Sequence, residues 1–156
     1  MVERRISKAI GIGNVTVGGG APIAVQSMTN TDTRDVRSTV NQINELAECG
    51  CEIIRVAVPD MEAAKSLPRI KKGISIPLIA DIHFDYRLAL ESIKSGVDAL
   101  RLNPGNIGNP EEVKKVVLAA KERQVPIRIG LNAGSLPKDL DSWWKQVGRR
   151  TNGETE

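Results

Sequence analysis

The chain has 156 residues and a formal net charge of +3, with 40% hydrophobic and 26% charged residues. This composition predicts a folded globular domain, and no apolar run approaches the roughly 18 residues that a membrane span requires. Only 3% of the residues are aromatic and the basic residues form no continuous stripe, which argues against a nucleic-acid partner. The N-terminus lacks the continuous apolar segment of a secretory signal, so we expect a cytoplasmic protein with no membrane partner.

Residues 1–20 predict a β-hairpin. The stretch RISKAIGIGNVTVGGG alternates apolar and polar residues around a Gly-Asn pair and ends in three glycines. We therefore expect an N-terminal hairpin before the main domain.

Residues 21–140 repeat a strand-then-helix unit. Apolar stretches predict five strands, and helical patterns separate the later ones; the strands are 22–28, 52–58, 77–83, 98–103 and 126–132. The stretches 77–83 and 126–132 are short and apolar, as expected for strands that are covered on both faces. In the last helical stretch, Asn109 suits the N-cap and Pro110 suits the first helical position. This alternation predicts an α/β fold with a parallel sheet.

Two architectures fit the repeat: an open doubly wound sheet, or part of a TIM-type (β/α)8 barrel. The chain contains neither GxGxxG after the first strand nor GxxxxGK[ST] anywhere, which weakens the case for a mononucleotide-binding sheet. A complete barrel takes about 250 residues, so about five units would form an incomplete one. Residues 141–156 would then be a polar tail or the start of the next helix.

Polar side chains gather at the ends of the predicted strands, where barrel enzymes build their sites. Arg55, Arg101 and Arg128 occupy the same relative place in their units, so we expect them to point into one cavity. A single arginine at such a place is more often one half of a structural ion pair. Three arginines in one mouth exceed the charge of the single aspartate, and guanidinium groups suit phosphate oxygens, which favours a phosphorylated or diphosphate ligand. The candidate ligand-binding residues are Arg55, Asp81, His83, Arg101, Asn103, Arg128 and Asn132.

Asp81 and His83 are the candidates for catalysis. The two-residue period of a strand places both side chains on one face, where the carboxylate can fix the tautomer of the imidazole. A lone histidine is more often a satisfied polar residue. The spacing matches no zinc signature, and no lysine lies in a predicted strand, so we expect neither a metal ligand nor a Schiff-base lysine here.

Cys49 and Cys51 are separated by one residue, which is too short for a CxxC redox or zinc motif. They lie between a predicted helix and a predicted strand. We expect them to pack as small buried side chains and to form no disulfide.

Five motifs in series resemble the N-terminal barrel of the 4-hydroxy-3-methylbut-2-enyl diphosphate synthase family, over about residues 4–140; they are PIAVQSMTNTDTRD, IIRVAVPD, PLIADIHFDYRLAL, ALRLNPGNIG and PIRIGLNAGSL. The resemblance implies a TIM-type (β/α)8 barrel whose mouth binds 2-C-methyl-D-erythritol 2,4-cyclodiphosphate. It implies reductive opening of that ring in isoprenoid biosynthesis by the methylerythritol phosphate pathway. It also implies substrate contacts at Arg55, His83, Arg101, Arg128 and Asn132, with Asp81 and Asn103 beside them.

Members of this family carry a [4Fe–4S] cluster on three cysteines and a glutamate of a separate C-terminal domain, which closes over the barrel of the partner subunit. Ferredoxin or flavodoxin supplies the electrons. That domain and its ligands are absent from the 156 residues, and Cys49 and Cys51 do not lie in cluster motifs. We therefore expect a fragment of the synthase that supplies the substrate-binding barrel and is inactive alone.

Two other functions stay open from the sequence. The strand and turn pattern is also similar to pterin-diphosphate-binding barrels of the dihydropteroate synthase type. Alternatively, the chain is a non-catalytic barrel fragment that associates with itself. Open sheet edges and the adjacent Trp143 and Trp144 favour a homodimer.

Overall fold

The computed structural model describes residues 5–103 and 107–130. The expectations for Asn132, for Trp143 and Trp144, and for the polar tail lie outside the described residues. The predicted N-terminal hairpin is confirmed, although its strands are short: β1 (Ile10–Ile12) pairs antiparallel with β2 (Val15–Val17). Gly13, with φ of +56°, supplies the left-handed backbone that this tight turn requires.

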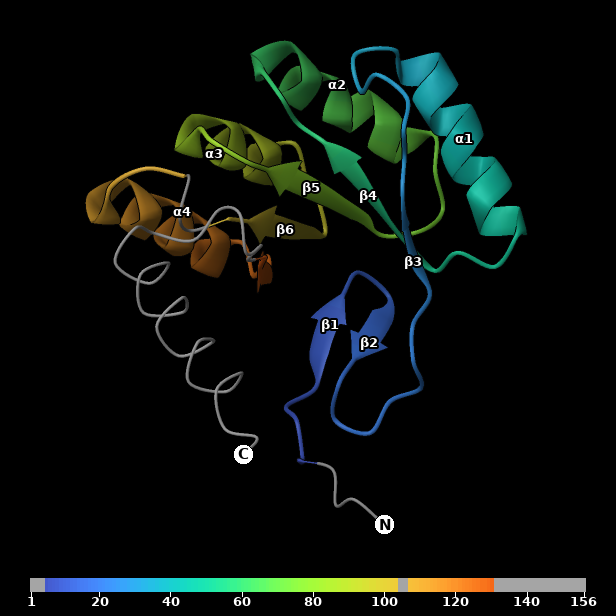
Figure 1. Ribbon diagram of the computed structural model, residues 1–156, viewed down its shortest axis with the longest axis horizontal. Coiled ribbons are helices and arrows are strands. Elements are labelled where there is room, and N and C mark those ends of the chain that lie inside the picture. Colours follow the sequence, from blue (N-terminus) through green and yellow to red (C-terminus); the bar gives the residue numbers. More distant parts are fainter. Residues whose placement is uncertain (1–4, 104–106, 131–156) are drawn as a thin grey trace, which may run out of the picture.

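The main domain is a five-stranded parallel sheet in which the strands follow one another in chain order (Figure 1). The strands are β3 (Gln26–Met28), β4 (Ile53–Ala57), β5 (Leu78–Ile82), β6 (Ala99–Leu102) and β7 (Ile127–Ile129). Each lies within one predicted stretch, which confirms the α/β fold with a parallel sheet. A doubly wound sheet reverses its strand order at a switch point, whereas the described strands show no reversal. This order is that of successive units of a barrel.

Four helices follow the first four of these strands, and each begins at a side-chain cap. They are α1 (Val36–Glu48), α2 (Met61–Lys72), α3 (Tyr86–Lys94) and α4 (Pro110–Glu122). Asp35, Asp60 and Asp85 cap the first three helices by accepting a hydrogen bond from a backbone N–H in the first turn. Asn109 caps α4 in a capping box with Glu112, and the predicted N-cap and Pro110 at the helix start are confirmed.

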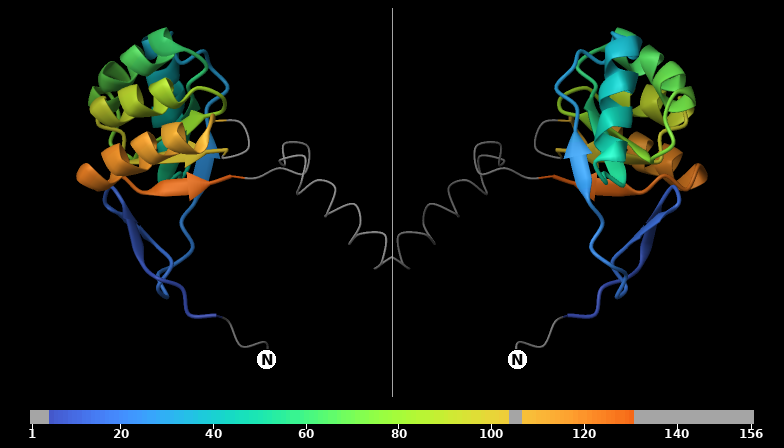
Figure 2. Two further views of the ribbon diagram at one scale, coloured as in Figure 1. Left: turned by 90° about the vertical axis from the view of Figure 1, so that its left-hand side faces the viewer. Right: turned by 90° about the vertical axis from the view of Figure 1, so that its right-hand side faces the viewer.

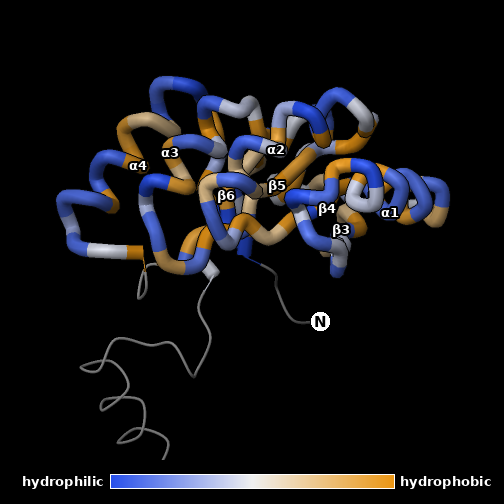
Figure 3. The backbone as a smooth tube through the Cα atoms, turned by 90° about the horizontal axis from the view of Figure 1, so that it is seen from above, coloured by the Kyte–Doolittle hydropathy of each residue, from blue (hydrophilic) through white to orange (hydrophobic). Residues whose placement is uncertain are grey.

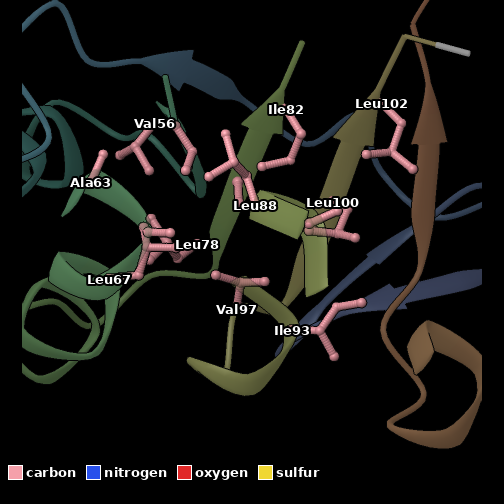
Figure 4. Close-up of a cluster of buried hydrophobic side chains, with 14 of the residues drawn as sticks. Val56, Ala63, Leu67, Leu78, Ile82, Leu88, Ile93, Val97, Leu100 and Leu102 are labelled. Atoms are coloured by element: carbon pink, nitrogen blue, oxygen red, sulfur yellow. The ribbon is translucent and has the colours of Figure 1, made fainter. Parts of the chain in front are cut away.

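The helices cover one face of the sheet, and the hairpin lies toward its other side (Figure 2). Alternate strand residues point to the helices and form the main core. All five residues of β5 are buried on one face or the other, as predicted for 77–83. Figure 4 shows part of this cluster, including Val56, Leu78, Ile82, Leu100 and Leu102 from the strands and Ala63, Leu67, Leu88 and Ile93 from the helices.

The prediction that the strand in 126–132 is covered on both faces is wrong. Arg128 and Ile129 in β7 are exposed, Ile129 to 69%. β7 is the last strand of the described sheet and has no further described strand beside it. An apolar stretch reports which side chains prefer burial, but it does not report whether a neighbour is present.

The opposite, concave face of the sheet is apolar at the amino-terminal ends of its strands. Ile53, Ile79 and Ala99 are buried there against Ile12 and Val15 of the hairpin. The hairpin therefore packs against the amino-terminal end of this face. The remaining, carboxyl-terminal end of the concave face carries the polar side chains.

We predict that Leu100→Ala lowers the free energy of unfolding by about 2–5 kcal/mol, because Leu100 is fully buried beneath the helices. The matched control is Leu118→Ala on the outer surface of α4, where the side chain is 57% exposed. Figure 3 shows that the outer turns of the helices are otherwise largely hydrophilic. The control is expected to change stability by less than about 0.5 kcal/mol in urea unfolding. Equal losses in the two variants would contradict this assignment of the core.

Candidate functional site

The buried carboxylate of Asp81 is the centre of the polar end of the concave face. Its side chain is 3% exposed, and three cationic or ionisable groups surround it. Oδ1 lies 3.1 Å from Nη1 of Arg101 and 3.1 Å from Nε2 of His83, while Oδ2 lies 3.2 Å from Nε of Arg55. We call Arg55, Asp81, His83 and Arg101 the Asp81 cluster. The expectation that Asp81 and His83 lie on the same face is thus met.

Strand register explains which of these residues are level with one another. Asp81 pairs with Arg101 across β5 and β6, and Arg101 pairs with Arg128 across β6 and β7. Arg55 pairs with Ile79, so it lies two residues below this row, and the expectation that all three arginines hold equivalent positions is wrong for Arg55. Its long side chain nevertheless reaches Asp81.

Arg101 is held at one further point of the fold. Its Nη2 donates to the backbone carbonyl of Gly130, at 3.2 Å, while its side chain is only 11% exposed. A Cβ at Gly130 would collide with the guanidinium of Arg101, so this close approach requires glycine. The residue after β7 therefore shapes the site through its lack of a side chain.

Arg128 makes a different contact. Its Nη1 donates to Oε1 of Gln26 at 2.9 Å, although 102 residues separate the two in the chain. Gln26 begins β3 and Arg128 lies in β7, which are the two outer strands of the described sheet. Side chains from opposite edges can meet only because the sheet curves strongly, as a barrel wall does.

The charges on this face do not balance. Arg55 and Arg101 share the single carboxylate of Asp81, and Arg128 forms no ion pair within residues 5–103 and 107–130. Asn103, which is 4% exposed, directly follows β6 at the same end of the sheet. Buried or half-buried charges of one sign repel unless a counter-charge is present, so this surface favours an anionic ligand.

The exposed loops around this face hold their arginines differently. Arg34 binds Asp32 at 2.7 Å and Asp60 at 3.2 Å, and its hydrogen bond lowers the pKa of Asp32 from 3.8 to about 2. Arg87 binds Asp85 at 2.7 Å and likewise lowers the pKa of that carboxyl. These rim arginines each have a carboxylate of their own, so they offer little positive charge to a ligand.

Below the polar end, the concave face opens into an apolar groove of about 890 Å3 between the hairpin and the lower ends of the strands. Ile12, Ile53, Ile79 and Ala99 contribute to its lining, and so do Gln26 and Arg128. The expectation of one cavity containing all three arginines is therefore not met by this groove, since Arg55 and Arg101 are not among its lining residues.

The described residues do not fit an iron–sulfur cluster. In that part of the chain, no group of three His, Cys, Asp or Glu side chains could hold a metal ion. Cys49 is exposed, whereas Cys51 is buried with its Sγ 3.1 Å from the carbonyl of Ile53. The prediction that they pack as small buried side chains is confirmed for Cys51 and wrong for Cys49.

Sequence reasoning missed three contributors to the site. Gln26 binds Arg128, Met28 places its sulfur 3.4 Å from the guanidinium of Arg55, and Gly130 accepts from Arg101. Gln26 and Met28 alternate along the predicted strand 22–28, so the two-residue period placed them on one face. The contact between Gln26 in β3 and Arg128 in β7 could not be predicted from any local sequence pattern, because 102 residues separate the two.

Comparison with known proteins identifies the family. Residues 7–152 match the family model described as the GcpE TIM-barrel domain. The chain belongs to the GcpE family.

Curated relatives of this GcpE chain carry the name 4-hydroxy-3-methylbut-2-en-1-yl diphosphate synthase (flavodoxin). The protein from Dehalococcoides mccartyi is 67% identical over 140 residues, which cover 90% of this chain and 40% of the relative. The protein from Thermodesulfovibrio yellowstonii is 62% identical over 140 residues, again with 90% and 40% coverage. The chain thus spans about two fifths of the length of these relatives.

Solved structures with a similar fold include two dihydropteroate synthases. The Yersinia pestis structure has a TM-score of 0.60 at 12% identity and covers 91% of the GcpE chain and 54% of its own. The Vibrio fischeri structure has a TM-score of 0.59 at 14% identity, with 90% and 59% coverage. At such identities the similarity shows a shared fold and carries no argument about pterin binding. Within the described part of the chain, no helix is long and apolar enough to cross a membrane.

We predict that Asp81→Asn lowers the free energy of unfolding by about 3–5 kcal/mol, because it leaves Arg55 and Arg101 half-buried or buried without their shared carboxylate. The control Asp32→Asn removes an exposed carboxylate that also binds an arginine, and it is expected to cost much less. Urea unfolding at pH 7 measures both. If the two variants lost the same stability, Asp81 would not be the centre of the cluster.

Proposed function

We propose that this GcpE chain is the substrate-binding barrel of a 4-hydroxy-3-methylbut-2-enyl diphosphate synthase and binds a cyclic diphosphate at the Asp81 cluster. The observation that supports this most is the excess of guanidinium groups over carboxylates on one face. Arginine forks bind phosphate oxygens in pairs of parallel hydrogen bonds, which suits a diphosphate.

The proposed ligand is 2-C-methyl-D-erythritol 2,4-cyclodiphosphate. Arg55, Arg101 and Arg128 would bind its diphosphate, and Asn103 and Asn132 would bind its hydroxyl or phosphate oxygens. These are polar groups of the kinds that a phosphorylated polyol requires.

His83 would handle a proton at the substrate. Its Nε2 lies beside Asp81, and a carboxylate in that position favours the proton on Nε2. Nδ1 of the neutral ring can then accept a hydrogen bond from a substrate hydroxyl, whereas only the imidazolium can donate to a substrate oxygen. The imidazole is 49% exposed, so a ligand in the mouth can reach it.

The [4Fe–4S] cluster that the family resemblance implies would supply electrons for reductive ring opening, with flavodoxin or ferredoxin as donor. The described residues do not fit that cluster, so we derive no step through it. We propose that this chain binds substrate and that turnover requires further sequence of the kind present in its longer relatives.

We also propose that the chain is a cytoplasmic homodimer. Both outer strands of the described sheet leave backbone groups unpaired in the described residues. Ile129 within β7 is 69% exposed, and Ile23, which precedes β3, is 89% exposed. Exposed apolar side chains next to open sheet edges favour association.

We predict that the 156-residue chain binds the cyclodiphosphate, measured by calorimetry, and that Arg55→Ala weakens binding about tenfold or more. Arg87→Ala is the control, because this exposed rim arginine is neutralised by Asp85 and should leave the affinity unchanged.

A pterin diphosphate is the competing ligand. Tighter binding of the pterin diphosphate than of the cyclodiphosphate would contradict the proposal, and so would equal losses in the two arginine variants.

A further inference from the structure

Gln26 and Arg128 form a contact that the proposed function leaves unexplained. Arg128 lies on an outer strand and is exposed, so its long side chain would be free to move without a partner. The partner that it has, Oε1 of Gln26 at 2.9 Å, is a neutral amide oxygen. The hydrogen bond therefore restrains the guanidinium and leaves its positive charge uncompensated.

This arrangement differs from that of other arginines around the site. Arg55 and Arg101 face the carboxylate of Asp81, and Arg34 and Arg87 each bind an aspartate on the rim. Only Nη1 of Arg128 is used in the contact with Gln26, so the other N–H donors of its fork stay available in the described part of the chain.

We infer that Gln26 is a positioning residue for Arg128, and that its neutrality is what keeps this arginine competent to bind an anion. The inference rests on the proposed function, because it assigns Arg128 to the bound diphosphate. A side chain that is already restrained loses less freedom when the ligand binds, which favours affinity.

A purely structural role makes a different prediction. The contact joins the two outer strands across the concave face, so it could serve only to maintain the curvature of the sheet. Gln26→Glu separates the two roles, because the introduced carboxylate keeps an acceptor of the same shape and strengthens the link to Arg128. It also neutralises the charge that the anion needs.

The test is calorimetric binding of inorganic pyrophosphate to the 156-residue chain at fixed ionic strength, with thermal unfolding of each variant. Gln26→Glu is expected to bind about tenfold or more weakly without a lower melting temperature. Gln26→Ala is expected to bind about threefold more weakly, because Arg128 loses its restraint. The control Gln124→Glu makes the same substitution at an exposed residue between α4 and β7, and it should bind as the unaltered chain does.

The outcomes separate the two proposals. Equal affinities of Gln26→Glu and Gln124→Glu, with Arg55→Ala still impaired, would overturn the role of Gln26 and leave the proposed function standing. If the unaltered chain failed to bind pyrophosphate and the cyclodiphosphate, both proposals would be wrong.

Discussion

A single buried carboxylate, that of Asp81, determines how the polar end of this sheet is organised. Removing a carboxylate from water costs several kcal/mol unless charge and hydrogen bonds replace its hydration. Here two guanidinium groups and an imidazole replace it, at 3.1–3.2 Å. These contacts compensate the lost hydration of the carboxylate, and they hold Arg55, Arg101 and His83 on one face. A surface with more positive than negative charge is the consequence.

The hairpin and the helices support this arrangement from opposite faces of the sheet. The hairpin packs Ile12 and Val15 against the amino-terminal end of the concave face, whereas the Asp81 cluster lies toward the carboxyl-terminal end. The helices bury the other face of the strands (Figure 2). The curvature of the sheet brings Gln26 to Arg128. On this face Arg128 therefore has a neutral hydrogen-bond partner, whereas Arg55 and Arg101 share the acidic Asp81.

The sequence predicted the elements and the kinds of residue at the site, because both depend on local patterns. Apolar stretches located every strand, Asn109 and Pro110 located the start of α4, and the two-residue period placed Asp81 and His83 on one face. Register and curvature depend on neighbours that are distant in the chain. For that reason the sequence did not predict three features: the displacement of Arg55 by two residues, the contact of Gln26 with Arg128 and the exposure of Ile129.

The most direct test of the account follows the arginine side chains themselves by nitrogen-15 NMR as pyrophosphate is added. We predict that the Nε–H signals of Arg55, Arg101 and Arg128 shift together and saturate, whereas those of Arg34 and Arg87 stay in place because aspartates already bind them. Shifts confined to the rim arginines, with the three on the concave face unmoved, would contradict it.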